Sequence, residues 1–276
     1  MTTWKCAIAA LLFALILSGA KPPSPGYAAY ERADALFAAK KLPEALAATE
    51  DALRLDPKLV PALILKAKLA MAAYRFDVAR RCLEQALAIA PRTPHLQFLY
   101  GFEAFLSNDM KEALPRLRKA RQLDPADPRA ALYLGLTTES LGQPAEAMSL
   151  YEEAVGLERS AGKLQAETLL PGARLLLILG RLEECERWIR QAVKLSPNSR
   201  DARFELARLL LKKGDAAHAA AEGETALALS EGIVTDAAIH YLLIRAWQQN
   251  GSPERAAMHA DVMRAQETPA NNKAKR

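Results

Sequence analysis

The chain has 276 residues, of which 51% are hydrophobic and only 6% aromatic, and its formal net charge is +5. This length allows one large domain or two ordinary ones, and an apolar content carried by alanine and leucine favours helices over a sheet. Acidic and basic residues alternate along the chain, which argues against a nucleic-acid-binding domain with its cations gathered on one face.

The first twenty residues have the pattern of a secretory signal peptide. Lys5 precedes an apolar stretch that ends at Leu17, shorter than the roughly 20 residues that cross a bilayer comfortably. Ser18 and Ala20 satisfy the small-x-small rule for signal peptidase, which predicts cleavage after Ala20. We therefore expect a signal peptide at 1–20 and a Pro-rich linker at 21–26.

This pattern predicts a bacterial protein that is exported to the periplasm or secreted. The alternative is an uncleaved N-terminal segment that anchors the chain in the membrane. No other segment is apolar enough to span a bilayer, so no span is expected once the signal is removed.

The phrase LPEALAATEDALRLDP, residues 42–57, returns along the chain. Its final proline is Pro57, and the copies that follow end at Pro91 and Pro125, with 34 residues between successive prolines. Later copies keep most of the alanines, and short insertions near 160–165 and 232–235 displace the copies that follow them. A strict spacing of this kind is the mark of a repeat architecture.

Each copy predicts two antiparallel helices joined by a short turn. The first helix ends near Gly, Asn or Lys and the second ends before Pro, as helix termini should. Small residues at two phases of the second helix let the helices of a pair approach closely. One pair cannot bury its own apolar face, so neighbouring pairs must stack into a continuous core.

At this point the sequence resembles the tetratricopeptide repeat (TPR) family, whose period is 34. The resemblance covers nearly all of the chain after the signal and weakens in the last repeat. The matching small residues include Gly101, Gly135, Ala45, Ala79, Ala113, Ala147, Ala219 and Ala256, and the matching large ones include Leu83, Leu117, Tyr151 and Ile189.

The resemblance implies an all-α fold, a right-handed α-solenoid of about seven antiparallel helix-turn-helix repeats over residues 27–266. The polar tail at 267–276 is expected to be disordered. One departure is Pro171-Gly172 in the first helix of repeat five, which predicts a kink or a late helix start there.

Catalytic and metal-binding patterns are absent from the sequence, so we expect no enzyme, no catalytic residue, no metal and no cofactor. The four histidines show no ligand spacing to one another. Cys82 and Cys185 each lie in an apolar helical pattern and are expected to be small buried core residues without a disulfide.

By the resemblance, the first helix of each repeat lines a concave groove. In the first four repeats this groove would present an apolar stripe, in which three aromatic residues of the third repeat share one helical face. The alternative is that the stripe packs against neighbouring repeats. The members expected to bind a partner are Phe98, Phe102, Phe105 and Leu132.

In the last three repeats the equivalent phase is cationic. Arginines recur there, with a lysine one turn after the second of them, and guanidinium groups would bind carboxylates of a partner. The alternative is pairing with acids such as Glu167 and Asp201. The cations are Arg174, Arg208, Lys212 and Arg245, and they do not reproduce the Lys and Asn pattern of relatives that clamp a C-terminal carboxylate.

The resulting prediction is a protein-interaction scaffold or adaptor of the cell envelope that binds a peptide or helical segment of another protein in its groove. The alternative is a non-catalytic accessory subunit or chaperone of an envelope secretion, assembly or polysaccharide-export system. Nucleic acid is not an expected partner, and self-association through the final helix is left open.

Overall fold

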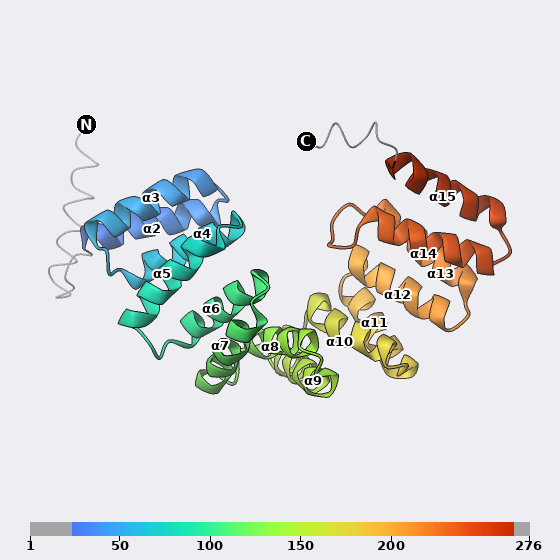
Figure 1. Cartoon of the computed structure of the whole chain (residues 1–276), viewed down its shortest axis with the longest axis horizontal. Helices are drawn as coiled ribbons and strands as arrows, with labels where there is room; N and C mark the ends of the chain where they lie inside the picture. Colours follow the sequence, from blue (N-terminus) through green and yellow to red (C-terminus); the bar gives the residue numbers. More distant parts are fainter. Residues whose placement is uncertain (1–23, 268–276) are drawn as a thin grey trace, which may run out of the picture. The chain divides into compact units, whose positions relative to one another are not determined.

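The computed structural model describes residues 24–267, which form fourteen α-helices and no strand (Figure 1). The predicted signal peptide lies outside these residues, as do residues 268–276 of the predicted tail. The chain divides into two compact units, one ending at Asp124 and the other beginning at Pro125. We call them unit 1 and unit 2.

Unit 1 contains three helix pairs, in which each helix packs against the next one along the chain. Its helices are α2 (Pro25–Ala38), α3 (Leu42–Leu55), α4 (Val60–Ala72), α5 (Phe76–Ile89), α6 (Pro94–Leu106) and α7 (Met110–Leu123).

Unit 2 contains four pairs built in the same way. Its helices are α8 (Pro128–Ser140), α9 (Pro144–Ser160), α10 (Ala166–Ile178), α11 (Leu182–Leu195), α12 (Arg200–Lys212), α13 (Ala216–Ala228), α14 (Asp236–Gln249) and α15 (Pro253–Glu267). The seven pairs in the described part of the chain agree with the predicted number of repeats.

Small residues set the spacing within a pair. A Cβ built on Gly101 would come within 2.6 Å of the Leu117 side chain, and one built on Gly135 within 2.7 Å of the Tyr151 ring. Tyr151 is fully buried. The pairing of a glycine on one helix with a large side chain on the next is the contact that the repeated small and large phases predict.

The turns inside the pairs share one backbone conformation. Positive φ angles occur at Lys40 (59°), Tyr74 (56°) and Asn108 (62°), again 34 residues apart, and at Gly142 (76°) one repeat later. The left-handed conformation ends the first helix of each pair, and the chain then turns back to form the second, antiparallel helix.

Helix boundaries correct two expectations. The predicted late start of repeat five is wrong, because α10 begins at Ala166 and carries Pro171 in its interior. Pro171 is the sixth residue of α10, past the four N–H groups that lack a partner at any helix start, so it removes one backbone hydrogen bond. The helix continues through it, with Pro171 buried beside Leu169, Leu170 and Ala173. Helix α2 begins at Pro25 under a Ser24 cap, so the last two residues of the expected linker are helical.

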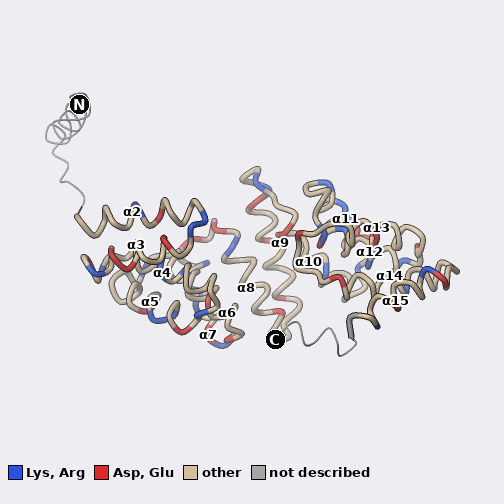
Figure 2. The backbone as a smooth tube through the Cα atoms, turned by 90° about the horizontal axis from the view of Figure 1, so that it is seen from above, with Lys and Arg blue, Asp and Glu red and all other residues tan. Residues whose placement is uncertain are grey.

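Cys82 and Cys185 are buried and free, as predicted. Lys and Arg alternate with Asp and Glu along the helices of each unit (Figure 2). No helix among the residues from 24 to 267 is both long enough and apolar enough to cross a membrane.

Candidate functional site

One candidate site is a groove in unit 2, lined by α10, α12 and α14, with α12 in contact with each of the other two. Its volume is about 630 Å³. Leu177, Leu211 and Leu242 are buried along it, whereas Ile178 and Tyr241 leave 69% and 59% of their surfaces exposed. A groove with exposed apolar side chains inside it is typical of a surface that binds another protein.

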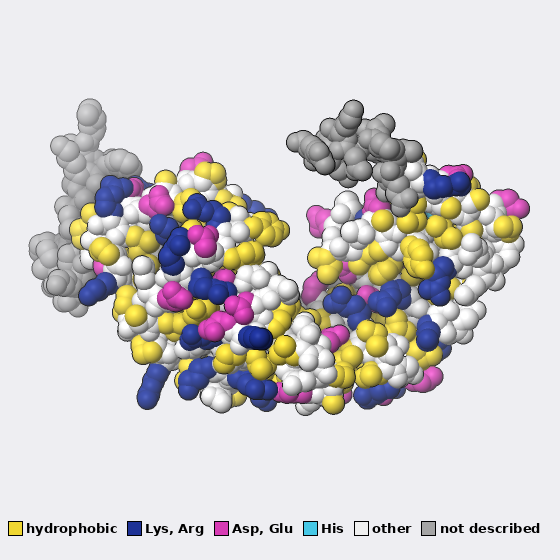
Figure 3. Space-filling view, in the orientation of Figure 1, with side chains coloured by type: hydrophobic (Ala, Val, Ile, Leu, Met, Phe, Trp, Pro, Cys, Tyr) yellow, Lys and Arg dark blue, Asp and Glu magenta, His cyan; other side chains and the backbone are white. Residues whose placement is uncertain are grey.

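Three of the four predicted cations line this groove: Arg208 and Lys212 on α12, and Arg245 on α14. Figure 3 shows Lys and Arg side chains lying together over this part of unit 2, with hydrophobic side chains around them. Lys212 and Arg245 are exposed, and neither forms an ion pair or a side-chain hydrogen bond with another described residue. Two cations are therefore available to carboxylates of a ligand.

Arg208 is already engaged inside the protein. Its Nη1 donates to the buried Glu205 carboxylate at 2.7 Å, and Arg174 Nε lies 3.9 Å from the other oxygen of the same group. Burial raises the pKa of Glu205, although both guanidinium groups favour its charged form. The Arg208 guanidinium also lies 5.9 Å from the centre of the Phe204 ring.

Arg174, the fourth predicted cation, lines a smaller depression of about 380 Å³ that it shares with Arg208. The buried Glu205 carboxylate serves both arginines, and Glu139 also lines the depression, so its two positive charges are balanced by two carboxylates. Glu139 lies at its edge and accepts a hydrogen bond from Tyr151.

Neither of the two acids that were expected to pair with these cations, Asp201 and Glu167, forms an ion pair with them. Asp201 accepts hydrogen bonds from the backbone N–H groups of Ile233 and Val234, at 2.8 to 3.1 Å. It therefore holds the loop that the insertion near 232–235 introduces. Glu167 forms no ion pair within the described part of the chain.

The predicted aromatic stripe belongs to α6 in unit 1. Phe98 is 5% exposed, and its ring stacks on Phe102 with centroids 5.9 Å apart and planes 4° from parallel. Phe102 and Phe105 are half-buried. Leu132, on α8 in unit 2, is half-buried and packs against the core of that unit. A partner-binding role for these four residues stays a prediction.

Tyr241 and Ile178 were not predicted as site residues. Tyr241 could have been found, because it precedes Arg245 by one helical turn and so shares its face. Glu205 could not, because its role depends on burial between two helices. No group of three His, Cys, Asp or Glu side chains that could hold a metal occurs among the described residues.

Comparison with known proteins agrees with this architecture. Two family profiles, both described as tetratricopeptide repeat, match the chain, one at residues 36–100 and the other at 5–59, 103–162 and 170–232. The TPR repeat-containing protein YpiA of Bacillus subtilis is 28% identical over 147 residues, which cover 52% of this chain and 33% of YpiA.

Cellulose synthase operon protein C of Pseudomonas fluorescens is 30% identical over 164 residues, which cover 58% of this chain and 13% of that protein. The chain thus spans a third or less of the length of both relatives. The structure of the Cut9–Hcn1 hetero-tetramer of the APC/C superposes with a TM-score of 0.71 at 19% identity, covering 82% of this chain and 44% of that one. At that identity the likeness concerns the fold alone.

One of the two profiles accounts for more than half of the chain, and the paired helices, the small-to-large contacts and the 34-residue spacing agree with it. The chain belongs to the tetratricopeptide repeat family.

Proposed function

We infer that this chain is a non-catalytic protein-interaction scaffold, and that the groove across α10, α12 and α14 is where a partner binds. TPR proteins are generally scaffolds of this kind. The observation that supports the site is the pair of unengaged cations, Lys212 and Arg245, beside the exposed side chains of Ile178 and Tyr241.

The expected ligand is a protein segment that carries carboxylates next to apolar side chains. Its carboxylates would face Lys212 and Arg245, and its apolar groups would cover Tyr241 and Ile178. A charge-assisted hydrogen bond in a partly desolvated groove contributes more than one in open water. The groove is open along its length, which suits a peptide or a helix better than an enclosed small molecule.

We place this scaffold in the bacterial envelope, on the strength of the signal-peptide pattern at 1–20. N-terminal sequencing of the mature protein tests the location: a first residue at Lys21 supports export with cleavage, and a first residue at Met1 supports the anchored alternative. The second candidate function, an accessory subunit of an envelope polysaccharide system, is favoured by the likeness to cellulose synthase operon protein C.

The groove is tested by cross-linked capture from the cell envelope with the full chain. A second bait carries Lys212→Glu and Arg245→Glu, and a control matched in charge carries Lys163→Glu and Lys194→Glu, at two exposed positions outside the groove. A partner that the control retains and the second bait loses supports the proposal. A partner retained equally by all three folded baits overturns the assignment of this groove.

A further inference from the structure

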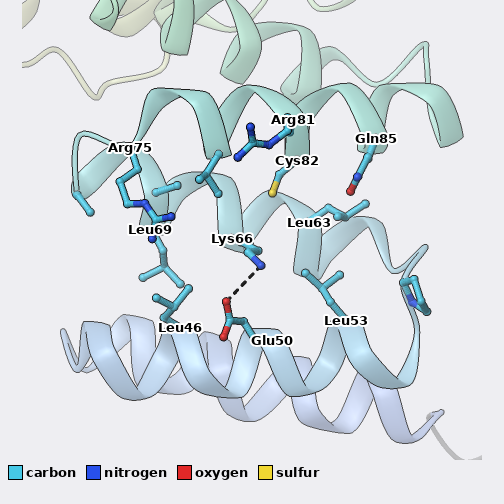
Figure 4. Close-up of a pocket in the computed structure, with 14 residues that line it drawn as sticks. Leu46, Glu50, Leu53, Leu63, Lys66, Leu69, Arg75, Arg81, Cys82 and Gln85 are labelled. Atoms are coloured by element: carbon cyan, nitrogen blue, oxygen red, sulfur yellow. Dashed lines mark ion pairs between the residues drawn. The ribbon is translucent and has the colours of Figure 1, made fainter.

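A second groove lies in unit 1, on a different set of helices. Its walls are α3 and α5, its floor is α4, and its volume is about 510 Å³ (Figure 4). Leu46 and Leu53 line one wall, and Leu63, Leu69 and Ala70 form the floor. The three floor residues are buried and the two wall leucines are half-buried.

The same groove one repeat later, between α5 and α7 above α6, is bridged by the protein's own side chains. Arg80 Nε donates to the fully buried Glu103 carboxylate at 3.1 Å, and Arg80 Nη1 lies 3.2 Å from Asp109. These three charged groups tie the wall, the floor and the adjoining turn together. Their counterparts 34 residues earlier are Leu46, Leu69 and Arg75.

The middle of the later groove is bridged as well. The Tyr100 hydroxyl donates to Glu84 at 2.9 Å, and the Arg116 guanidinium covers the Tyr100 ring at 4.4 Å from its centre. In the earlier groove a single ion pair crosses the floor, between Lys66 and Glu50 at 3.3 Å. The counterparts of Tyr100, Glu84 and Arg116 are Lys66, Glu50 and Cys82.

The groove of unit 1 is therefore open because apolar or shorter side chains occupy three positions that carry bridging side chains in the later groove. Leucines stand where the arginine and the glutamate of the later groove form their ion pair, and a cysteine stands where an arginine covers a ring. An apolar groove that the chain itself leaves unfilled can be covered by a partner.

The charge of the lining indicates which partner. Three cations line the groove, Lys66, Arg75 and Arg81, against one carboxylate, Glu50. Lys66 is paired with Glu50, and Arg81 is paired with Asp77 at 3.0 Å. Arg75 is exposed and has no ion pair or side-chain hydrogen bond with any residue of the described range. The lining is complementary to an acidic ligand.

We propose that this groove binds an amphipathic helical segment of a partner protein, with an apolar stripe and a carboxylate beside it. Leu46 and Leu53 lie two turns apart on α3, about 10 Å along the helix, which matches positions i and i+7 of a bound helix. The apolar stripe covers the leucines of wall and floor, and the carboxylate faces Arg75. This site is separate from the groove of unit 2 and does not depend on it.

Selection of helical peptides from a random displayed library, with the full chain as target, tests the proposal. The counter-target carries Leu46→Arg, Leu69→Glu and Arg75→Asp, which rebuilds the Arg80–Glu103–Asp109 arrangement in the earlier groove. Lys194→Glu lowers the net charge by the same two units and lies outside both grooves, so it is the matched control. We expect the selected peptides to combine apolar residues at i, i+3 or i+4 and i+7 with Asp or Glu. They should bind the counter-target at least tenfold more weakly and the control unchanged.

Arg75→Asp alone changes an exposed side chain and provides a second measurement if the triple variant does not fold. Peptide affinity should fall, and should recover when the acidic residue of the peptide is changed to Lys. Peptides that bind the triple variant as tightly as the wild type overturn the proposal. So do an enriched set without the acidic and apolar pattern, a failure to enrich any peptide, and self-association that the triple variant abolishes, which would make a second copy the occupant.

Discussion

At the scale of single residues, several glycines pack directly against a large side chain of the next helix. Gly135 is buried against Tyr151, so a methyl group at this position must push the ring or the helix aside. We expect Gly135→Ala to lower the free energy of unfolding by about 1–3 kcal/mol, as overpacking of a core usually does. Urea denaturation followed by circular dichroism measures it.

Gly156 supplies the matched control within the same pair of helices. It lies inside α9, and a Cβ built on it meets nothing within 4 Å. Gly156→Ala should therefore raise stability by up to about 1 kcal/mol, because alanine is the better helix former. Equal effects of the two changes would show that the contact with Tyr151 does not set the spacing.

At the scale of elements, the turn inside each helix pair needs one residue with a positive φ angle, and different residue types fill this position. Lys40 has a φ of 59° and carries a side chain in a conformation that costs an L-residue about 1–2 kcal/mol. Lys40→Gly should stabilise unit 1 by about 1 kcal/mol, read as a higher denaturant midpoint. Gly142→Ala, at the equivalent turn of a later repeat, should destabilise by a similar amount. A loss of stability in Lys40→Gly would mean that the contacts of the lysine side chain stabilise the turn by more than its positive φ angle costs.

The contact between α14 and α15 contains a pair of imidazoles. The Nδ1 atoms of His240 and His259 lie 3.0 Å apart, and His259 Nε2 lies 3.1 Å from the Glu224 carboxylate on α13. One Nδ1 must donate and the other must accept, so this contact cannot form when both rings are protonated. Burial, followed by the neighbouring His259, holds the pKa of His240 below its ordinary value, although Asp236 and Glu224 oppose the shift.

The sign of the pH dependence follows from that direction. The unfolded chain takes up the proton of residue 240 at a higher pH than the folded chain, so stability is full above the ordinary histidine pKa of about 6.5 and falls as the pH drops below it. Trp247 is a local probe, because Arg255 of α15 covers its ring at 4.4 Å. We expect its fluorescence to change between pH 7.5 and 5 in the wild type, and much less in His240→Phe. An unchanged wild-type signal would contradict the prediction.

The secondary structure was predictable because the same helix-pair pattern recurs in several repeats of the sequence. The spacing of Pro57, Pro91 and Pro125 predicts the helix pairs, and the small residues between them predict which faces meet. The start of α10 was not predictable from Pro171 alone, because packing decides whether one missing hydrogen bond ends a helix.

The two grooves were predictable to different degrees. Periodicity predicted that Arg208 and Arg245 share a face, and the groove of unit 2 has both along it. The contact of Arg208 and Arg174 with the buried Glu205 carboxylate depends on tertiary packing, which no spacing specifies. The groove of unit 1 is defined by bridging side chains that its neighbour has and it lacks, and this difference is visible only once the register of the repeats is known.

At the scale of the whole molecule, each pair of helices packs mainly on its neighbours in sequence. A destabilising substitution should therefore lower the local stability of its own pair and the adjacent pairs more than that of distant ones. Arg80 is the test, because removing it leaves the buried Glu103 carboxylate without its main partner. We expect Arg80→Ala to cost about 3 kcal/mol, as an uncompensated buried charge does. In hydrogen exchange, protection should fall across α5, α6 and α7 of unit 1 and be kept in α12, α13 and α14 of unit 2.

Two control variants distinguish the effect of breaking the buried Arg80–Glu103 pair from the effect of removing any arginine. Arg81→Ala removes an exposed pair with Asp77 on the same helix and should cost less than about 1 kcal/mol. The double change Arg80→Leu with Glu103→Leu copies the leucines found at 46 and 69, and should recover most of the stability because no charge is left buried. If Arg80→Ala instead lowers protection equally in both units, the molecule unfolds as one cooperative body and the neighbour-by-neighbour description of its stability is wrong.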